Sequence, residues 1–214
     1  MPNECRQPRR IARARELPIL LASVVLLAGV ACYAIPVTAS SGPQPWEDGL
    51  VRVYDAGGLG RTVTTAAERW NDSGARVRLI QVGAPDDADV IVEVDDRKLR
   101  RACGSDCLGY TSSIGRPSEG QVEVLLAAEL TGDPRPLSVW VAAHEFGHVL
   151  GLHHRDGRAC SLMSAHAFDT SCAPSLAAAP PTADQLACVP APTDVEDAAA
   201  LYGGRLIWDD TRCR

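Results

Sequence analysis

The sequence predicts a single α+β domain built around a mixed β-sheet, preceded by an N-terminal targeting segment. The elements follow one another in the order strand, helix, strands, helix, coil and helix, and no internal repeat appears. The composition, with 46% hydrophobic and 22% charged residues, is that of an ordinary globular protein and excludes a disordered or collagen-like chain. The 214 residues suffice for one domain with a substantial core, and hardly for two.

The N-terminus combines a basic flank with a long uncharged stretch. Five arginines lie within residues 1–16, and the apolar segment 17–37 follows them. This arrangement is typical of an export signal whose basic end stays in the cytoplasm. The length of the apolar segment favours a retained membrane anchor, whereas Val37 and Ala39 have the spacing of a signal-peptidase site. A cleaved signal peptide and an anchor therefore both remain open.

The chain is accordingly divided into four predicted segments. These are a basic cytoplasmic N-terminus (1–16), a signal peptide or signal anchor (17–39), a linker (40–47) and a folded domain (48–214). We expect the domain to be extracytoplasmic, either secreted or held at the outer face of the membrane, and to be a monomer. Beyond residue 39 the chain has 16 basic and 25 acidic residues, which argues against nucleic acid as a partner.

The first half of the domain contains one helical pattern between strand-like runs. A run of strand-forming residues occupies 50–54. Two more strands are predicted over 76–82 and 89–94. Between the first strand and these two, apolar residues recur at i, i+3, i+4 and i+7 and predict a helix that ends before Gly74; they are Val63, Ala66, Ala67 and Trp70.

The second half begins with two short strands and continues into helices. We predict strands over 108–114 and 121–126, with a turn over 116–120 between them. The longest helical pattern of the chain covers 138–151, and the segment 155–192 is irregular. The stripe of that long helix consists of Ala142, Phe146, Val149 and Leu150.

The last predicted element is a helix with clear start and stop signals. Thr193 and Glu196 have the spacing of a capping box, and Gly203-Gly204 ends the pattern. Its predicted buried face consists of Val195, Ala198, Ala199 and Tyr202.

The cysteines indicate an oxidising compartment. Two of the eight belong to the targeting region, and an even number remains in the domain, as expected of a disulfide-bonded exported protein. Neighbours in sequence suggest the pairs Cys103 with Cys107, Cys160 with Cys172, and Cys188 with Cys213. A zinc–thiolate cluster is not favoured because no Cys-x-x-Cys unit is present.

The histidines carry the strongest chemical signal. All five lie between residues 144 and 166, and His144 and His148 are four residues apart, so that on a helix they face the same way. Glu145 lies beside them, where its carboxylate can reach a water molecule without binding the metal. Gly151 can end the helix in a left-handed conformation and let the chain bring back His154 as third ligand. His153 is the other candidate for that position, although the spacing favours His154.

Three histidine ligands with one open position are what a catalytic zinc ion requires. A zinc ion lowers the pKa of a bound water molecule and polarises a carbonyl group, while Glu145 can act as general base and return the proton to the leaving amine. The sequence therefore predicts an enzyme that hydrolyses peptide bonds with zinc.

The extended motif resembles that of a known family. The pattern HExxHxxGxxH followed by a methionine turn marks the metzincin metallopeptidases, and residues 144–154 and 161–164 are similar to these two parts. Within the metzincins, the segments 137–152 and 194–203 resemble matrixins. The cysteine pair around the methionine turn is similar to that of the bacterial snapalysins, although those have Asp where His154 stands.

This resemblance implies a zincin domain whose twisted mixed sheet carries an active-site helix and a C-terminal helix. It implies that Met163 forms a hydrophobic floor beneath the metal, and that the loop 164–171, with His166 and Phe168, walls the pocket after the cleaved bond. An extended polypeptide substrate would add to the edge strand formed by Leu108, Gly109, Tyr110 and Thr111.

The sequence also departs from the family pattern. The cysteine-switch motif of matrixins is absent, which puts thiolate latency in doubt, and Ala165 stands where astacins and serralysins have a tyrosine. Five aspartates allow two interpretations. Solvated loop charges are favoured, and a calcium site is the alternative, for Asp86, Asp87, Asp89, Asp95 and Asp96. Two rival functions are a zinc-bearing peptide-binding module, against which the intact Glu145 speaks, and an amidase for cell-wall peptides, which would use the same attack by water.

Overall fold

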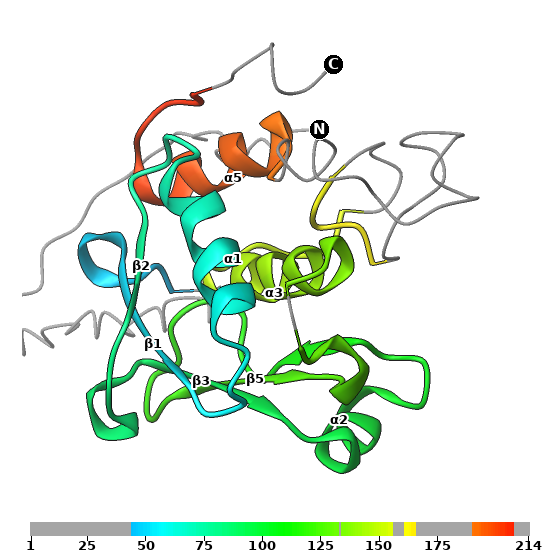
Figure 1. Ribbon diagram of the computed structural model, residues 1–214. Coiled ribbons are helices and arrows are strands. Elements are labelled where there is room, and N and C mark those ends of the chain that lie inside the picture. The colour runs from blue at the N-terminus through cyan, green and yellow to red at the C-terminus, as the bar shows by residue number, and fades with distance from the viewer. Residues whose placement is uncertain (1–43, 133, 156–160, 166–189, 208–214) are drawn as a thin grey trace, which may run out of the picture. The chain divides into compact units, whose positions relative to one another are not determined.

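A five-stranded sheet lies at the centre of the fold, in the strand order β2-β1-β3-β5-β4 (Figure 1). The computed structural model describes residues 44–132, 134–155, 161–165 and 190–207, all within one compact unit, 40–214. Four strands are mutually parallel, and β4 at the edge runs antiparallel to β5. The predicted mixed sheet is confirmed by strands β1 (Leu50–Asp55), β2 (Arg78–Gln81), β3 (Val90–Val94), β4 (Gly109–Thr111) and β5 (Val122–Leu126).

Helices α1 (Arg61–Asn71) and α3 (Pro136–Val149) pack on each other over the sheet (Figure 1). Alternate strand residues supply the apolar surface beneath them, as the period of two of a β-strand requires. The Trp70 indole N–H donates to the Ala143 carbonyl at 2.8 Å, which ties the two helices together. The core is formed by fully buried side chains, among them Val51, Val53, Val90, Val92, Val122 and Val124.

The predicted apolar stripe accounts for only part of the buried surface of the long helix, because α3 is buried almost all round. The sheet and α1 both cover it, so that the buried part extends over every residue from Val141 to Val149. The helix begins two residues before the predicted start and ends at Val149. The C-terminal helix α5 (Pro192–Tyr202) also begins before its predicted capping box: its N-cap is Ala191, not Thr193, and the Asp194 carboxylate accepts the Ala191 N–H at 2.9 Å.

Helix α2 (Asp96–Cys103) was not predicted. Leu99 is its only buried residue, so no apolar periodicity marks it. The signals present are Asp95, whose side chain accepts the N–H groups of Arg97 and Lys98, and Gly104 at its end. The disulfide between Cys103 and Cys107 follows directly, which confirms the first predicted pair.

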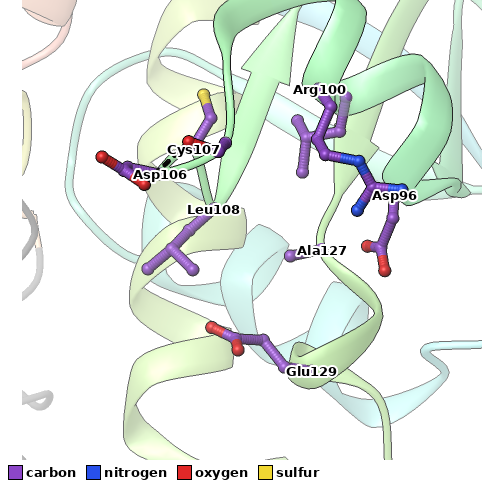
Figure 2. Close-up of a pocket in the computed structure, with 9 residues that line it drawn as sticks. Asp96, Arg100, Asp106, Cys107, Leu108, Ala127 and Glu129 are labelled. Atoms are coloured by element: carbon purple, nitrogen blue, oxygen red, sulfur yellow. Dashed lines mark hydrogen bonds between the residues drawn. The ribbon is translucent and has the colours of Figure 1, made fainter.

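A hollow of about 350 Å³ lies between α2 and the start of β4. Asp106 and Leu108 line one side of it, and Asp96 and Arg100 line the other (Figure 2). Glu129, in the 3-10 turn Ala128–Leu130, closes it below Leu108. The hollow therefore adjoins the edge strand at its N-terminal end.

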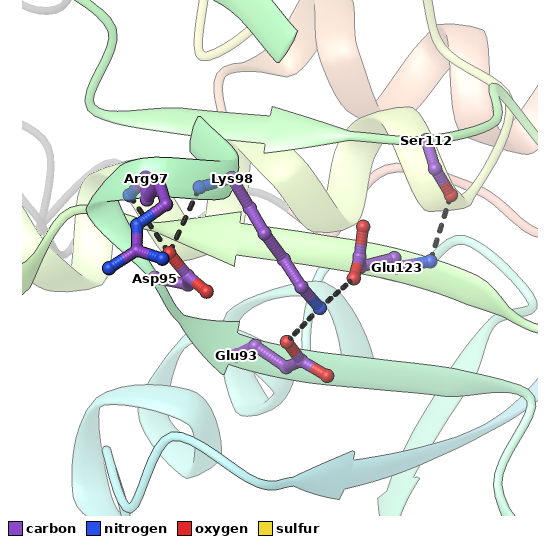
Figure 3. Close-up of polar contacts among 6 residues, drawn as sticks. All are labelled: Glu93, Asp95, Arg97, Lys98, Ser112 and Glu123. Carbon is purple, nitrogen blue, oxygen red and sulfur yellow. Dashed lines mark hydrogen bonds and ion pairs between the residues drawn. The ribbon is translucent and has the colours of Figure 1, made fainter. Parts of the chain in front are cut away.

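Lys98 fastens α2 to the outer surface of the sheet. Its ammonium group lies 2.7 Å from a Glu123 oxygen on β5 and 2.6 Å from a Glu93 oxygen on β3 (Figure 3). The hydrogen bonds to Glu123 and Glu93 raise the pKa of Lys98. Ser112 accepts the Glu123 N–H at 2.8 Å, which extends the link to the segment that follows β4.

Three of the five aspartates weighed as calcium ligands, Asp89, Asp95 and Asp96, bind other groups of the protein. Asp89 forms an ion pair with Arg52 at 2.8 Å, and this contact lowers its pKa although burial opposes the shift. Asp95 caps α2, and Asp96 accepts the Ala128 N–H at 2.8 Å. Within the part of the chain that the structure describes, these carboxylates form no group able to hold a cation.

No helix among residues 44–132, 134–155, 161–165 and 190–207 is long and apolar enough to cross a membrane. The predicted signal peptide or anchor, 17–39, lies outside the described residues, so its form stays a prediction.

Candidate metal centre

The C-terminal end of α3 turns the chain back beneath its own last turn. Gly151 has φ +95°, its N–H donates to the His148 carbonyl, and the Leu152 N–H donates to the Gly147 carbonyl, both at 2.9 Å. These two bonds form a Schellman motif, which requires the left-handed conformation that glycine adopts without a steric penalty. The sequence predicts this turn, and it brings His154 back towards the helix.

Three imidazole groups converge on one point. The Nε2 atom of His154 lies 3.2 Å from that of His144 and 3.0 Å from that of His148. One ligand atom from each ring lies within 4.8 Å of the others. No other set of three His, Cys, Asp or Glu side chains in the described segments is this close, and His153 is not part of the group.

Backbone carbonyl groups fix the other nitrogen atoms of two rings. His144 Nδ1 lies 2.6 Å from the Leu162 oxygen, and His148 Nδ1 lies 2.8 Å from the Leu152 oxygen. Because a carbonyl only accepts, both rings carry the proton on Nδ1 and present the Nε2 lone pair to the common point. Burial lowers the pKa of His144 to about 3 and that of His148 to about 4. Both imidazoles are thus neutral at pH 7, the state that binds a metal ion.

Met163 packs under the same turn of α3. It is only 1% exposed. A Cβ atom at Gly147 would lie 2.3 Å from its Sδ atom, so the methionine fits because residue 147 lacks a side chain. Gly147 lies between the two helical histidines in sequence, and the predicted hydrophobic floor is therefore in contact with the backbone that carries them.

Asp194, from α5, holds the turn that contains Met163. Its carboxylate accepts the Ser161 hydroxyl at 2.5 Å and the Leu162 N–H at 2.7 Å. It is 1% exposed, and burial raises its pKa while these hydrogen bonds oppose the shift. In the sequence, Asp194 stands at the start of the predicted C-terminal helix and of the matrixin-like segment 194–203, and no role in the site was predicted for it. The available signal is an acidic residue next to Val195, which belongs to the predicted buried face.

Glu145 points towards the edge strand β4. It is 4% exposed, and its Oε2 atom accepts the Thr111 hydroxyl at 2.6 Å. A Cβ atom at Gly109 would lie 2.4 Å from its Oε1 atom. Burial raises the pKa of Glu145 to about 7, although the Thr111 hydrogen bond lowers it. Such a carboxyl group exchanges protons close to neutral pH, as a general base does.

Two distant aromatic residues bind the carbonyl groups at the end of α3. The Trp46 indole N–H donates to the Val149 carbonyl at 2.7 Å, and the Tyr202 hydroxyl donates to the Leu150 carbonyl at 2.8 Å. The Tyr202 oxygen also accepts the backbone N–H of Trp46 at 3.3 Å. Helix termini leave such carbonyls without intrahelical partners, so these bonds stabilise the end from which His148 projects.

The predicted substrate residues are placed only in part. Gly109, Tyr110 and Thr111 form the edge strand, which is shorter than the predicted strand 108–114, and Leu108 precedes it. His166 and Phe168 lie outside the described residues, as do the cysteines of the other two predicted pairs, Cys160, Cys172, Cys188 and Cys213. Those assignments stay predictions.

Comparison with known proteins adds little to this description. No family model matches the sequence, and no curated protein is significantly similar to it. The solved structures that match include one titled "Structure of myroilysin", at 21% identity and a TM-score of 0.36. The match covers 52% of this chain and 52% of the other, so this chain spans about half the length of that protein. Function therefore has to be argued from the residues of the site.

Proposed function

We propose that this chain is an exported, zinc-dependent endopeptidase. The observation that carries the proposal is the convergence of three imidazole nitrogens beside a buried carboxylate, at the edge strand of a sheet. The targeting segment supports export, and the motif supports a metzincin of matrixin-like type.

The residues present fit a zinc ion. Neutral imidazole is a preferred zinc ligand, and two of the rings are oriented by carbonyl groups in the manner usual for metal-binding histidines. His144, His148 and His154 would hold the ion and leave one coordination position open, as a catalytic site requires. When bound, the zinc ion would supply a Lewis acid that makes water more acidic and polarises the scissile carbonyl.

The remaining steps belong to the protein. Glu145 takes a proton from the attacking water and delivers it to the nitrogen of the leaving amine, so that no covalent intermediate with the protein forms. Its burial keeps bulk water away from the carboxylate. Thr111 donates to one of its oxygens, which leaves the other available for this proton.

The edge strand supports a polypeptide substrate. The bonds from Ala127 N–H to the Leu108 carbonyl and from Ser112 N–H to the Glu123 carbonyl direct these residues of the edge towards β5. In an antiparallel ladder the intervening residues, Gly109 and Thr111, then direct their backbone groups away from β5. An extended peptide can add there as a further strand.

The test uses the full chain with and without a chelator, on a peptide library derived from a proteome. We expect cleavage that is lost on chelation and restored by zinc. Glu145→Ala should retain stoichiometric zinc and lose turnover. His153→Ala, beside the proposed ligand His154, should retain both. Cleavage that survives in the Glu145→Ala protein would contradict the proposal, as would a zinc-loaded wild-type protein that binds peptides and cuts none.

A further inference from the structure

Two residues of β4 contact the same carboxylate from the same side. Gly109 and Thr111 are two apart, so on a strand they face the same surface of the sheet. That surface lies against α3, where Thr111 Oγ1 is 2.6 Å from Glu145 Oε2. The space beside Gly109, which a Cβ atom would occupy, holds Glu145 Oε1, Cδ and Cγ at 2.4 to 2.9 Å from that atom position.

The Thr111 hydroxyl donates its hydrogen bond to the Glu145 carboxylate. The same oxygen lies 3.3 Å from the Glu145 backbone carbonyl, but a hydroxyl has one proton and the contact to Oε2 is much the shorter. A hydrogen bond to a charged acceptor is stronger than one between neutral groups. Oε2 is therefore held, and Oε1 is the oxygen that remains to receive a proton from water.

Binding and positioning use different parts of Thr111. Its side chain faces Glu145, whereas its backbone groups point to the open edge where a peptide adds. A change of the side chain alone can thus disturb Glu145 and leave the peptide-binding edge unchanged.

We propose that Thr111 is a positioning residue for Glu145, and that Gly109 gives the carboxylate the space it needs. This inference rests on the proposed hydrolytic function. Thr111 orients the general base through its hydroxyl and does not itself touch the reacting atoms. The edge strand thereby serves both to bind the peptide and to aim the base.

The experiment compares Thr111→Val, which keeps the shape and removes the hydroxyl, with Thr111→Ser, which keeps the hydroxyl. In the zinc-loaded full chain we expect Thr111→Val to lower kcat about ten- to hundredfold with KM changed less than about twofold, which is smaller than the loss on removing a general base. Thr111→Ser should stay within about threefold of the wild type. Thr131→Val is the matched control, because the Thr131 hydroxyl donates only to the Ala128 carbonyl in a surface turn.

Gly109→Ala tests the other contact. Gly109 does not have a positive φ, so alanine meets no backbone strain, and the three atoms nearest to its added Cβ all belong to the Glu145 side chain. We expect a loss of kcat with full zinc content. Crystal structures of the variants give a readout that is independent of turnover: Glu145 should move from its wild-type position in Thr111→Val and Gly109→Ala, and keep it in Thr111→Ser.

The outcomes separate this inference from the proposed function. If the wild type cleaves peptides and Thr111→Val matches it in kcat, the positioning role is wrong while the function stands. If the wild type cleaves nothing, the proposed function fails, and the crystal structures alone then decide the inference. An unmoved Glu145 in Thr111→Val would overturn it in either case.

Discussion

His144 and Asp194 form hydrogen bonds with the two backbone groups of the same residue, Leu162. Asp194 Oδ2 accepts the N–H of Leu162 at 2.7 Å, and the carbonyl of Leu162 accepts Nδ1–H of His144 at 2.6 Å. A carboxylate on α5 therefore fixes the peptide segment that orients a ring of the metal centre. The C-terminal helix thus contributes to the orientation of His144 through Leu162.

Replacing Asp194 by Ala should weaken metal binding. The change leaves the Ser161 hydroxyl and the Leu162 and Ala191 N–H groups without their acceptor, so the segment that orients His144 loosens. Loss of such an outer partner typically lowers metal affinity about 10- to 100-fold. Competition with a chromophoric chelator measures the Kd for zinc. The control is Glu196→Ala at an exposed position of the same helix, and equal affinities in the two variants would refute the link.

Gly147→Ala should destabilise the protein although alanine favours helices. In an exposed helix this change stabilises by roughly 1 kcal/mol. Here the new methyl group would lie 2.3 Å from Met163 Sδ and 3.2 Å from the Trp70 ring, and overpacking of this kind costs about 1–3 kcal/mol. Urea unfolding of the metal-free protein measures the difference.

A second variant identifies the cause of that loss. Combining Gly147→Ala with Met163→Ala removes the group that the new methyl meets, so the pair should be less destabilised than the sum of the single changes. Gly83→Ala, where nothing lies within 4 Å of the added Cβ, is the neutral control. Strict additivity would show that the methionine does not restrict residue 147.

The sequence predicts those parts of the structure that depend on local spacing. The histidine spacing and Gly151 suffice to predict the triad, because helix periodicity and a left-handed glycine fix the course of the chain there. Strands β1 and β3 are likewise predicted by runs rich in valine and isoleucine. Helix α2 escapes prediction because a single buried leucine has no period.

Contacts between distant segments could not be predicted from one sequence. The bond between Thr111 and Glu145 joins residues 34 positions apart, and that between Trp46 and Val149 joins residues 103 apart. Nothing in the spacing of either pair indicates the contact. Each arises only once the sheet has placed β4 beside α3 and the chain before β1 has packed against the end of the helix.

Removing the Tyr202 hydroxyl should destabilise the end of α3. Tyr202→Phe deprives the buried Leu150 carbonyl of its donor and the backbone N–H of Trp46 of its acceptor. Leaving such groups unsatisfied costs about 1–3 kcal/mol. Tyr54→Phe is a suitable control, since the Tyr54 hydroxyl bonds to none of the residues in the described ranges. Thermal unfolding that gives equal Tm values for the two variants would contradict this role.

Metal-free protein should respond to acid through three groups of the site with opposing signs. The pKa values of His144 and His148 are lowered to about 3 and 4, so below pH 6.5 the unfolded state takes up protons that the folded state does not, and stability falls. The pKa of Glu145 is raised to about 7, so the folded state takes up a proton first and stability rises as the pH falls towards 4.5.

The net change of stability with pH is the sum of these three contributions, and it is tested by removing one of the titrating groups. Between pH 7 and pH 5 each histidine removes about 2 kcal/mol of stability and Glu145 restores about 2 kcal/mol, which leaves a net loss of about 2 kcal/mol. Glu145→Gln abolishes the opposing contribution, so its loss should be about twice as large. His148→Gln should flatten the dependence. Urea unfolding in the presence of chelator measures all three proteins, and a Glu145→Gln protein no more acid-sensitive than the wild type would show that Glu145 does not take up a proton in this pH range.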